Sequence, residues 1–494
     1  MVLGIELGST RIKSVIIDST RKAVQSGTHN WENRLENGFW TYDLDDVQAG
    51  LRDVISQSDT SNITALGVSA MMHGYLAFDK NDNLLTPFRT WRNTTTETAA
   101  AQLTKLFGFN VPQRWSVAHL YQAILNGEEH IKNISFITTL AGYVHFQLTG
   151  AKVLGIGDAS GMFPVENGEY NKMFVRRFEE LTGINWFNIA PKILSAGEFA
   201  GSLTASGAEF LGFPENLVGI PLCPPEGDAG TGMVATNAIS PRTGNVSAGT
   251  SIFAMAVLEK PLKNLHTEID IVTTPSGEDV AMIHCNSCTS DIDAWVKVFG
   301  EISGRSANQL YDLFYEKAGS ALNGRAIRPP AGGILTYNFY SGEPVAGVPD
   351  GRPMLIRAPD AEFNLANLCK SLLYSAIATL RVGMDILFGE EVKLDVMRGH
   401  GGFFKNSAGL QAVADSLNVP VSVFQSADEG GAWGIALLAD FLTSDVTLEE
   451  YLREIFTEPE VVCKPDEAGV KIFNAYLETF KKGLEVQRKA AEVL

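Results

Sequence analysis

The stretch Pro221–Val257 reads PLCPPEGDAGTGMVATNAISPRTGNVSAGTSIFAMAV. It holds an aspartate between glycines, Gly227-Asp228-Ala229-Gly230, and then a turn of small residues, Ser247-Ala248-Gly249-Thr250-Ser251, that leads into an apolar run. Glycines let a backbone approach a ligand closely, and successive amides with hydroxyl side chains can surround phosphate oxygens. Each feature alone is a loop, but together they predict a phosphate site with a carboxylate beside it.

The first residues of the chain have the same form as this second turn. Val2–Asp18 is an apolar strand, a turn at Gly8-Ser9-Thr10 and a second strand, and residues 245–258 repeat that order. Gly8 and Gly249 lie 241 positions apart, close to half of the 494 residues. We interpret this as an internal duplication in which each half begins with a phosphate-binding hairpin. The alternative is a chance match of two Gly-hydroxyl turns.

Length and charge restrict the kind of protein. A chain of 494 residues exceeds what one hydrophobic core usually holds, so we expect two domains, and the duplication puts their boundary near residue 240. The net charge of −18 argues against nucleic acid and anionic membranes as partners, because both are bound by basic surfaces. ATP is not excluded, since backbone amides and a metal ion can hold its phosphates locally.

Targeting signals and cysteines indicate a cytoplasmic protein. Met1 runs directly into an apolar strand without a signal-peptide pattern, and no run reaches the roughly 18 apolar residues of a membrane span. The five cysteines are odd in number and scattered, which suits reduced thiols. Cys285-x-x-Cys288 could bind a metal or act in redox chemistry, but no second Cys/His pair stands at zinc-ligand spacing, and we favour buried thiols.

Two strand ends in the first half lead into polar and aromatic loops. The strand 63–70 ends at Met71-Met72-His73-Gly74, and the strand 75–78 precedes a loop that contains Trp91. Strand ends are where α/β sheets keep ligand sites. An imidazole can hydrogen-bond hydroxyls, and an indole can cover the apolar face of a sugar. The alternatives are a histidine satisfied by the backbone and a core aromatic.

The second half alternates helices and strands. Residues 361–388 predict a long helix with one buried stripe, followed by a strand at 392–397, the turn Gly399-His400-Gly401-Gly402 and a helix to Leu417. This glycine-rich turn would let the adenosine end of a nucleotide approach the backbone, although such turns also serve only to pack a strand against a helix. In the first half, Asp158-Ala159-Ser160-Gly161 predicts another loop.

Known phosphate-binding loops of other scaffolds are absent from the sequence. It contains neither the Gly-x-x-x-x-Gly-Lys-Ser/Thr loop nor the glycine-rich loop and His-Arg-Asp of protein kinases. Phosphate transfer would therefore need another scaffold.

The motifs, taken in chain order, resemble the FGGY carbohydrate kinases, and the resemblance covers nearly the whole chain. It implies an α/β fold of two ribonuclease-H-like domains, as in actin and hexokinase, with the active site in the cleft between them. Residues 1–240 would bind the sugar and carry the catalytic aspartate, and residues 241–494 would bind ATP. The matching segments are Gly4–Thr10, Met72-His73-Gly74, Trp91-Arg92-Asn93, Gly227-Asp228, Gly249-Thr250-Ser251, Ser341-Gly342-Glu343, Gly401-Gly402 and Glu429–Gly434.

Three positions depart from the family pattern. Glu6 stands where the family usually has Asp, which lengthens the side chain by one methylene. Ala229 replaces an Asn on the sugar's side of the site, and Phe403 replaces the third glycine of the adenosine loop. These changes leave the preference for sugar and nucleotide open.

The resemblance also implies roles for individual residues. Asp228 would be the base that accepts the proton of a sugar hydroxyl as the γ-phosphoryl of ATP is transferred, and the alternative is an ordinary turn aspartate. Glu6 and Asp228 would bind Mg²⁺. The residues expected to contact ATP are Ser9, Thr10, Arg11, Gly249, Thr250, Ser251, Gly401, Gly402 and Asn406. Those expected to bind the sugar are Met72, His73, Trp91, Asn93 and Asp228.

The Met72-His73-Gly74 loop resembles that of xylulose kinases, so a ketopentose such as D-xylulose is the first choice of substrate. L-Xylulose, L-ribulose, other ketoses and sugar alcohols are alternatives. Two rival classes share the fold, an ATPase of the actin and heat-shock type and a catalytically silent sugar-binding regulator. The terminal helix, residues 472–494, fits either a contact with the first domain or a homodimer interface. The partners expected are thus a small sugar, no nucleic acid, no membrane and, in the second case, another copy.

Overall fold

The structure is a computed structural model that describes residues 1–320, 330–424, 430–457 and 461–494. The chain forms two compact units. The first unit comprises Met1–Ser240, Leu265–Val280 and Glu429–Thr457, and the second comprises Pro241–Asn264, Ala281–Asp428 and Glu458–Leu494. The chain therefore leaves the first unit after Ser240 and returns to it twice.

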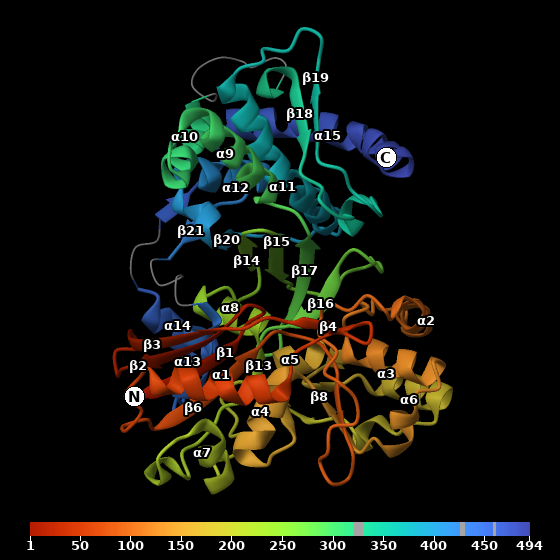
Figure 1. Cartoon of the computed structure of the whole chain (residues 1–494), viewed down its shortest axis with the longest axis vertical. Helices are drawn as coiled ribbons and strands as arrows, with labels where there is room; N and C mark the ends of the chain where they lie inside the picture. The colour runs from red at the N-terminus through yellow and green to blue at the C-terminus, as the bar shows by residue number, and fades with distance from the viewer. Residues whose placement is uncertain (321–329, 425–429, 458–460) are drawn as a thin grey trace. The chain divides into compact units, whose positions relative to one another are not determined.

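The first unit is built on a five-stranded sheet (Figure 1). Its strands, in spatial order, are β13 (Glu226–Gly227), β6 (Ala65–Ala70), β1 (Val2–Leu7), β2 (Arg11–Ile17) and β3 (Ala23–Asn30). The helices of this unit are α1 (Leu44–Ser56), α2 (Glu97–Phe107), α3 (Ser116–Leu125), α4 (Leu140–Thr149), α5 (Ile156–Ser160), α6 (Lys172–Thr182), α7 (Ala205–Leu211), α8 (Asp228–Ala235), α13 (Gly430–Phe441) and α14 (Leu448–Ile455). Its shorter strands are β4 (Arg34–Glu36), β5 (Phe39–Thr41), β7 (Leu76–Phe78), β8 (Phe136–Thr138), β9 (Val153–Gly155), β10 (Val165–Glu166), β11 (Glu169–Tyr170), β12 (Lys192–Leu194) and β16 (Asp270–Thr273).

The second unit has its own sheet. The strands lie in the order β17 (Asp279–Cys285), β15 (Ile252–Val257), β14 (Thr243–Ala248), β20 (Val396–His400), β21 (Val421–Val423) and β22 (Val461–Cys463), and a separate pair is formed by β18 (Ile334–Tyr337) and β19 (Met354–Arg357). The helices are α9 (Ser290–Ser303), α10 (Ala307–Ser320), α11 (Leu365–Gly389), α12 (Ser407–Leu417) and α15 (Glu467–Val493).

The two sheets repeat one topology. β1 is antiparallel to β2 and parallel to β6, and β14 is antiparallel to β15 and parallel to β20. In each unit the first strand of the hairpin is therefore central, buried between its hairpin partner and a crossover strand. The predicted α/β class with a duplicated arrangement is confirmed.

Two segments predicted as loops begin or form helices. Asp228 is the first residue of α8, and residues 156–160 form α5. The amides at the start of α5 are capped by Glu226, which lies far along the sequence. The loop prediction for Asp158-Ala159-Ser160-Gly161 is therefore wrong, because the stabilising group is not local.

Helix α11 differs from the prediction of one buried stripe. Its buried residues lie on every side and include Lys370, and it packs against α10, α12 and β18. It is also the one helix among the described residues that is long and apolar enough to cross a membrane by length and composition, with a mean hydropathy of 1.4. No such run was expected from the sequence. A helix that is apolar all round and mostly buried is typical of the core of a large unit, and 67% of that window is buried.

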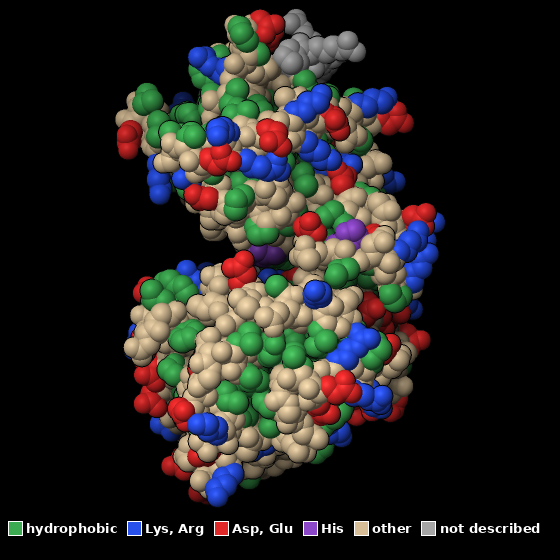
Figure 2. Space-filling model, turned by 90° about the vertical axis from the view of Figure 1, so that its right-hand side faces the viewer, with side chains coloured by type: hydrophobic (Ala, Val, Ile, Leu, Met, Phe, Trp, Pro, Cys, Tyr) green, Lys and Arg blue, Asp and Glu red, His purple; other side chains and the backbone are tan. Residues whose placement is uncertain are grey.

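Charged side chains of both signs are scattered over the face of the molecule shown in Figure 2, among hydrophobic and other side chains. The net charge of −18 is thus not accompanied by a separate basic patch on this face.

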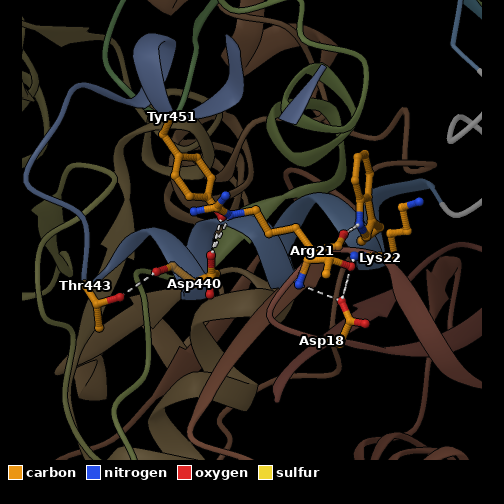
Figure 3. A network of polar contacts seen from close by, with 8 residues as sticks. Asp18, Arg21, Lys22, Asp440, Thr443 and Tyr451 are labelled. Atoms are coloured by element: carbon orange, nitrogen blue, oxygen red, sulfur yellow. Dashed lines mark hydrogen bonds and ion pairs between the residues drawn. The ribbon is translucent and has the colours of Figure 1, made fainter. Parts of the chain in front are cut away.

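A polar network fixes α13 to the turn between β2 and β3 (Figure 3). Arg21 Nε donates to Asp440 Oδ2 at 3.1 Å, the Tyr451 hydroxyl donates to the same oxygen at 2.7 Å, and the Arg21 guanidinium lies 4.7 Å from the centre of the Tyr451 ring. Trp433 Nε1 donates to the Arg21 carbonyl at 2.9 Å. These contacts hold a helix from near the end of the chain against the first hairpin.

The backbone of α13 lies directly on β1, and this contact generates a stability prediction. A Cβ added at Gly4 would lie 2.1 Å from the Ala432 carbonyl oxygen and 2.7 Å from the Ala436 nitrogen. We expect Gly4→Ala to lower the free energy of unfolding by about 3 kcal/mol or more, because neither backbone atom can move without displacing the helix. Gly389→Ala at the end of α11 is the control, since nothing lies within 4 Å of its added Cβ. Urea unfolding midpoints measure both, and equal midpoints would refute the contact.

Candidate active site

The turn of the first hairpin is held from behind by aromatic side chains. Gly8 N donates to the Arg11 carbonyl at 2.9 Å, which closes the turn. Trp31 Nε1 donates to the Gly8 carbonyl at 2.7 Å, and the Tyr42 hydroxyl donates to the Ser9 carbonyl at 2.6 Å. Trp91 Nε1 donates to Ser9 Oγ at 3.2 Å. Trp91, predicted to line a sugar pocket, is thus hydrogen-bonded to the first hairpin.

The second hairpin has an equivalent support in the other unit. Gly249 N donates to the Ser251 carbonyl at 2.9 Å, Cys288 N donates to the Thr250 carbonyl at 2.8 Å, and Thr289 Oγ1 donates to the Gly249 carbonyl at 2.9 Å. The Cys285-x-x-Cys288 loop is therefore a structural brace for the turn. Both thiols are fully buried, and burial raises the pKa of each far above its usual value. The interpretation as buried thiols is confirmed, and no metal-binding group of three His, Cys, Asp or Glu occurs in the described parts of the chain.

Glu6 and Asp228 come from neighbouring parts of the first unit. Asp228, at the start of α8, accepts a hydrogen bond from Met72 N to Oδ1 at 3.1 Å. Glu6, on β1, accepts one from Ala432 N to Oε2 at 3.2 Å, at the N-terminus of α13. A Cβ on Gly431 would lie only 2.6 Å from Glu6 Oε1, so this glycine makes room for the longer side chain that replaces the expected Asp.

The two carboxylates influence each other's charge. Burial, and then the charge of Asp228, raise the pKa of Glu6 to about 7. Burial also raises the pKa of Asp228 above its usual range, against the opposing effect of the Met72 amide. The Lys13 ammonium on the neighbouring strand opposes this rise for Glu6, and two carboxylates that lie close together disfavour simultaneous ionisation. Their surroundings therefore suit a group that brings positive charge.

A second pair of buried carboxylates lies next to the first and was missed in the sequence. Glu226 Oε1 and Oε2 accept hydrogen bonds from Gly157 N at 3.2 Å and Asp158 N at 2.9 Å. Thr139 Oγ1 donates to Asp158 Oδ2 at 2.5 Å. Burial raises the pKa of both carboxyls. A glutamate directly before the Gly227-Asp228 turn was the signal that could have pointed to this pair.

The Met72-His73 loop lies against Asp228 and Gly161. His73 has a φ of 72°, and its ring Nδ1 donates to the Gly161 carbonyl at 3.2 Å. The imidazole stacks on Trp115 with ring centres 6.3 Å apart. A non-glycine residue in the left-handed region costs energy, and such residues occur in turns and cluster at functional sites. Trp115, which supports this ring, was not predicted.

Asn93 does not face a pocket. Its Oδ1 accepts from Trp40 N at 2.8 Å, and its Nδ2 donates to the carbonyls of Trp40 and Thr90, each at 2.9 Å. Both amide protons are therefore used within the fold. Asn93 is left out of the sugar-binding residues that we propose below.

The glycine-rich turn of the second unit adjoins the second hairpin. Gly401 has a φ of 100°, and an added Cβ would lie 2.7 Å from the Ala248 carbonyl oxygen, at the end of β14. Gly402 begins the short 3-10 helix that follows, and Asn406 caps α12 through a bond from Ala408 N to Oδ1 at 2.9 Å. The strand predicted for 392–397 begins later than expected and runs to His400.

A cavity of about 460 Å³ opens beside Asn406, between α10 and α12. The Tyr315 ring in its wall meets Phe403 edge-on, with ring centres 6.2 Å apart. Phe403, which replaces a family glycine, thus supports the cavity. The residues that line it are Asp312, Tyr315, Glu316, Gly319, Asn406, Ser407, Ala408 and Gln411.

Three other predicted residues lie in or directly beside the two hairpin turns. Thr10 lies exposed in the first turn, Arg11 is exposed at the start of β2, and Ser251 is half-buried at the end of the second turn. Glu429 of the predicted Glu429–Gly434 motif lies outside the described residues. The structure thus brings the first hairpin, Glu6, Asp228 and the Met72-His73 loop together in one unit, and the second hairpin and Gly401 together in the other.

Each of the two topologically equal units contains such a hairpin, and carboxylates lie beside the first. This arrangement is that of the ATP-dependent enzymes built on a duplicated ribonuclease-H-like fold. Family models narrow the class. The N-terminal domain of the FGGY family of carbohydrate kinases matches residues 1–234, and its C-terminal domain matches residues 244–442. The chain belongs to this family and is a carbohydrate kinase, with ATP and a sugar as its substrates.

The similarity to individual relatives covers nearly the whole chain. A xylulose kinase of Haemophilus influenzae is 28% identical over 511 residues, which cover 96% of this chain and 98% of the relative. A solved structure from Brucella ovis described as a xyloylose kinase has a TM-score of 0.81 at 19% identity and covers 98% of this chain and 99% of its own. A gluconate kinase from Lactobacillus acidophilus has a TM-score of 0.82 at 17% identity, with 98% and 97% covered. These two structures agree with the fold and do not distinguish between sugars.

The raised pKa of Glu6 predicts a pH-dependent stability in the absence of nucleotide and metal. Its value of about 7 lies above the ordinary 4.5, so the native state binds the proton more tightly than the unfolded chain. The contribution of Glu6 to stability is therefore present at low pH and is lost as the pH rises from about 4.5 to 7. Glu6→Gln has no carboxyl group that could titrate at this position. The free energy of unfolding of this variant, relative to that of the wild type, should therefore rise by on the order of 3 kcal/mol as the pH rises from about 4.5 to 7. Urea titrations at several pH values measure it, and a constant difference would contradict the assignment.

Proposed function

We propose that this kinase transfers the γ-phosphoryl of ATP to a hydroxyl of a ketopentose, with D-xylulose as the first candidate and Asp228 as the general base. The contact between Asp228 Oδ1 and the amide of Met72 carries the proposal, because it holds the carboxylate beside the loop expected to bind the sugar. The Haemophilus influenzae relative, a xylulose kinase, supports the choice of sugar. L-Xylulose, L-ribulose, other ketoses and sugar alcohols stay alternatives.

We assign to Asp228 the role of accepting the proton of the sugar hydroxyl. Phosphoryl transfer passes through a loose transition state, so the sugar hydroxyl loses its proton late, as its oxygen bonds to phosphorus. A carboxylate in hydrogen-bond reach of that hydroxyl can accept it. Burial, which raises the pKa of Asp228, makes it a stronger base than a carboxylate in water. Met72 and His73 would position the sugar, with Trp91 at the side of the first hairpin.

The carboxylates fit a magnesium ion. Glu6 and Asp228 offer the hard oxygen ligands that Mg²⁺ prefers, and a divalent cation would offset the desolvation and the repulsion by Asp228 that raise the pKa of Glu6. When bound, Mg²⁺ would neutralise charge on the phosphates. We therefore include it as the metal of the reaction, held directly or through water.

The phosphates of ATP would lie on the turn amides and hydroxyls of the two hairpins, with Ser9, Thr10, Thr250 and Ser251 as the main groups and Arg11 as a further contact. Adenosine would approach Gly401 and Gly402 and enter the cavity beside Asn406, whose volume of about 460 Å³ suits a base and its ribose. A cytoplasmic location and a homodimer stay predictions.

A coupled assay of ADP release tests the function. We expect one ketose in a panel of ketoses, aldoses, sugar alcohols and glycerol to raise ADP release from Mg-ATP manyfold. Asp228→Asn should lower that sugar-dependent rate by about 10²- to 10⁴-fold, the usual contribution of a general base, with ADP binding retained. Sugar-independent ADP release would instead indicate an ATPase, and sugar binding without turnover would indicate a silent regulator.

The cavity predicts a separate effect on the nucleotide. Gly319→Leu would place an isobutyl group in it, where an added Cβ meets only Ala408 at 3.5 Å. We expect the KM for ATP to rise about tenfold while kcat and the KM for the sugar change little, because the lost contact is made equally in ground and transition states. If the KM for ATP stays at the wild-type value, adenosine binds elsewhere.

A further inference from the structure

The segment Gly155–Gly161, which contains α5, touches two parts of the proposed acceptor site. A Cβ added at Gly157 would lie 2.5 Å from Glu226 Oε2, immediately before the Gly227-Asp228 turn. A Cβ added at Gly161 would lie 2.6 Å from His73 Nδ1 and 2.7 Å from Met72 Cε. No side chain larger than hydrogen therefore fits at these two positions, and the segment packs closely against both the Glu226 side chain and the Met72-His73 loop.

Glu226 forms the connection between α5 and the turn that carries Asp228. Both of its carboxylate oxygens accept backbone amides, those of Gly157 and Asp158, and the side chain is 1% exposed. A Cβ at Gly155 would lie 2.2 Å from Glu226 Oε1, so glycines at both 155 and 157 are required for the carboxylate to sit there. Gly155 N also donates to the Pro225 carbonyl at 2.8 Å, which joins the two segments a second time.

The contact between α5 and Glu226 also brings the Asp158 side chain close to the Gly227-Asp228 turn. Asp158 Oδ1 is buried without a hydrogen-bond partner and would lie 3.3 Å from a Cβ at Gly227. That Cβ would also lie 2.8 Å from Met72 Cγ. Gly227 is thus enclosed by α5 on one side and the Met72 side chain on another, and the direction in which α8 starts is fixed by both.

From these contacts we propose that Glu226 is a positioning residue for Asp228. Its two hydrogen bonds hold the Gly227-Asp228 turn and the Met72-His73 loop against a common support, the segment 155–161. This inference rests on the proposed role of Asp228 as the base. It assigns to Glu226 no contact with substrate, and its consequence is that the transition state, rather than nucleotide binding, depends on it.

The test compares two chemically equal substitutions in the full-length enzyme. Glu226→Gln keeps the shape of the side chain but replaces one acceptor oxygen by an NH₂ group that faces a backbone N–H. Glu390→Gln is the matched control. Glu390 is 6% exposed, and its carboxylate accepts Lys263 N and Asn264 Nδ2, each at 2.7 Å, in the second unit.

We expect Glu226→Gln to lower the sugar-dependent kcat by about 10- to 100-fold, the loss typical of a misplaced reacting group, with the KM for ATP within twofold of wild type. Glu390→Gln should lower thermal stability without this fall in kcat. A wild-type kcat in Glu226→Gln, or an equal fall in both variants, would overturn the proposal.

If Glu226→Gln fails to fold, Gly157→Ala decides the test, because it leaves Glu226 in place, and a wild-type kcat in this variant would overturn the proposal. Gly157→Ala pushes directly on the carboxylate and should lower kcat in the same way. In a Glu226→Ala background the carboxylate is gone, so adding Gly157→Ala should have no further effect on kcat. Additive losses would show that Gly157 acts independently of Glu226 and would refute the connection.

Asp228→Asn, measured in the same assay, distinguishes a failure of the positioning role of Glu226 from a failure of the proposed function. If it abolishes sugar-dependent turnover while Glu226→Gln and Gly157→Ala do not lower kcat, the base assignment stands and the positioning role fails. If Asp228→Asn retains turnover, the proposed function itself fails.

Discussion

Two partly buried carboxylates, Glu6 and Asp228, lie so close that desolvation and then the charge of Asp228 raise the pKa of Glu6. Folding places them there at a cost in free energy, since a buried charge is disfavoured without a partner. Each is therefore held by a backbone amide from another element, Ala432 N for Glu6 and Met72 N for Asp228. The first hairpin, α8 and α13 meet where these bonds form. Lys13 offsets part of the charge on Glu6, and the two carboxylates together offer oxygen ligands to a further cation.

Glycines make the close packing around these carboxylates possible. β1 carries Glu6 and rests on the backbone of α13 at Gly4, where no Cβ fits. Gly431 opens the space that the Glu6 carboxylate fills, and Gly157 opens the space for Glu226. The polar network of Arg21, Asp440 and Tyr451 then fixes the opposite part of α13. Close approach of the backbone at glycines thus makes the space that the carboxylates occupy.

Local patterns predicted the hairpins and the duplicated α/β topology, because apolar strands and the Gly, Ser and Thr turns between them are read from neighbouring residues. They failed for α5 and for Glu226, since the helix is capped by a residue almost seventy positions away. Asn93 matched a family segment, yet its amide binds the backbone of Trp40, 53 positions away, and of Thr90. Hydrogen bonds between distant segments are invisible in one sequence, and they decide which polar side chains are available to a substrate.

Family membership establishes a carbohydrate kinase, and the assignment of Asp228 as the base with a ketopentose as acceptor is the part that chemistry must decide. The most direct measurement is ³¹P NMR of the products formed from Mg-ATP and D-xylulose by the wild-type enzyme. The account predicts a new phosphate monoester, with its phosphorus coupled to the protons of a sugar carbon, formed in equal amount to ADP. ADP accompanied by inorganic phosphate alone would contradict it, because the γ-phosphoryl would then have passed to water.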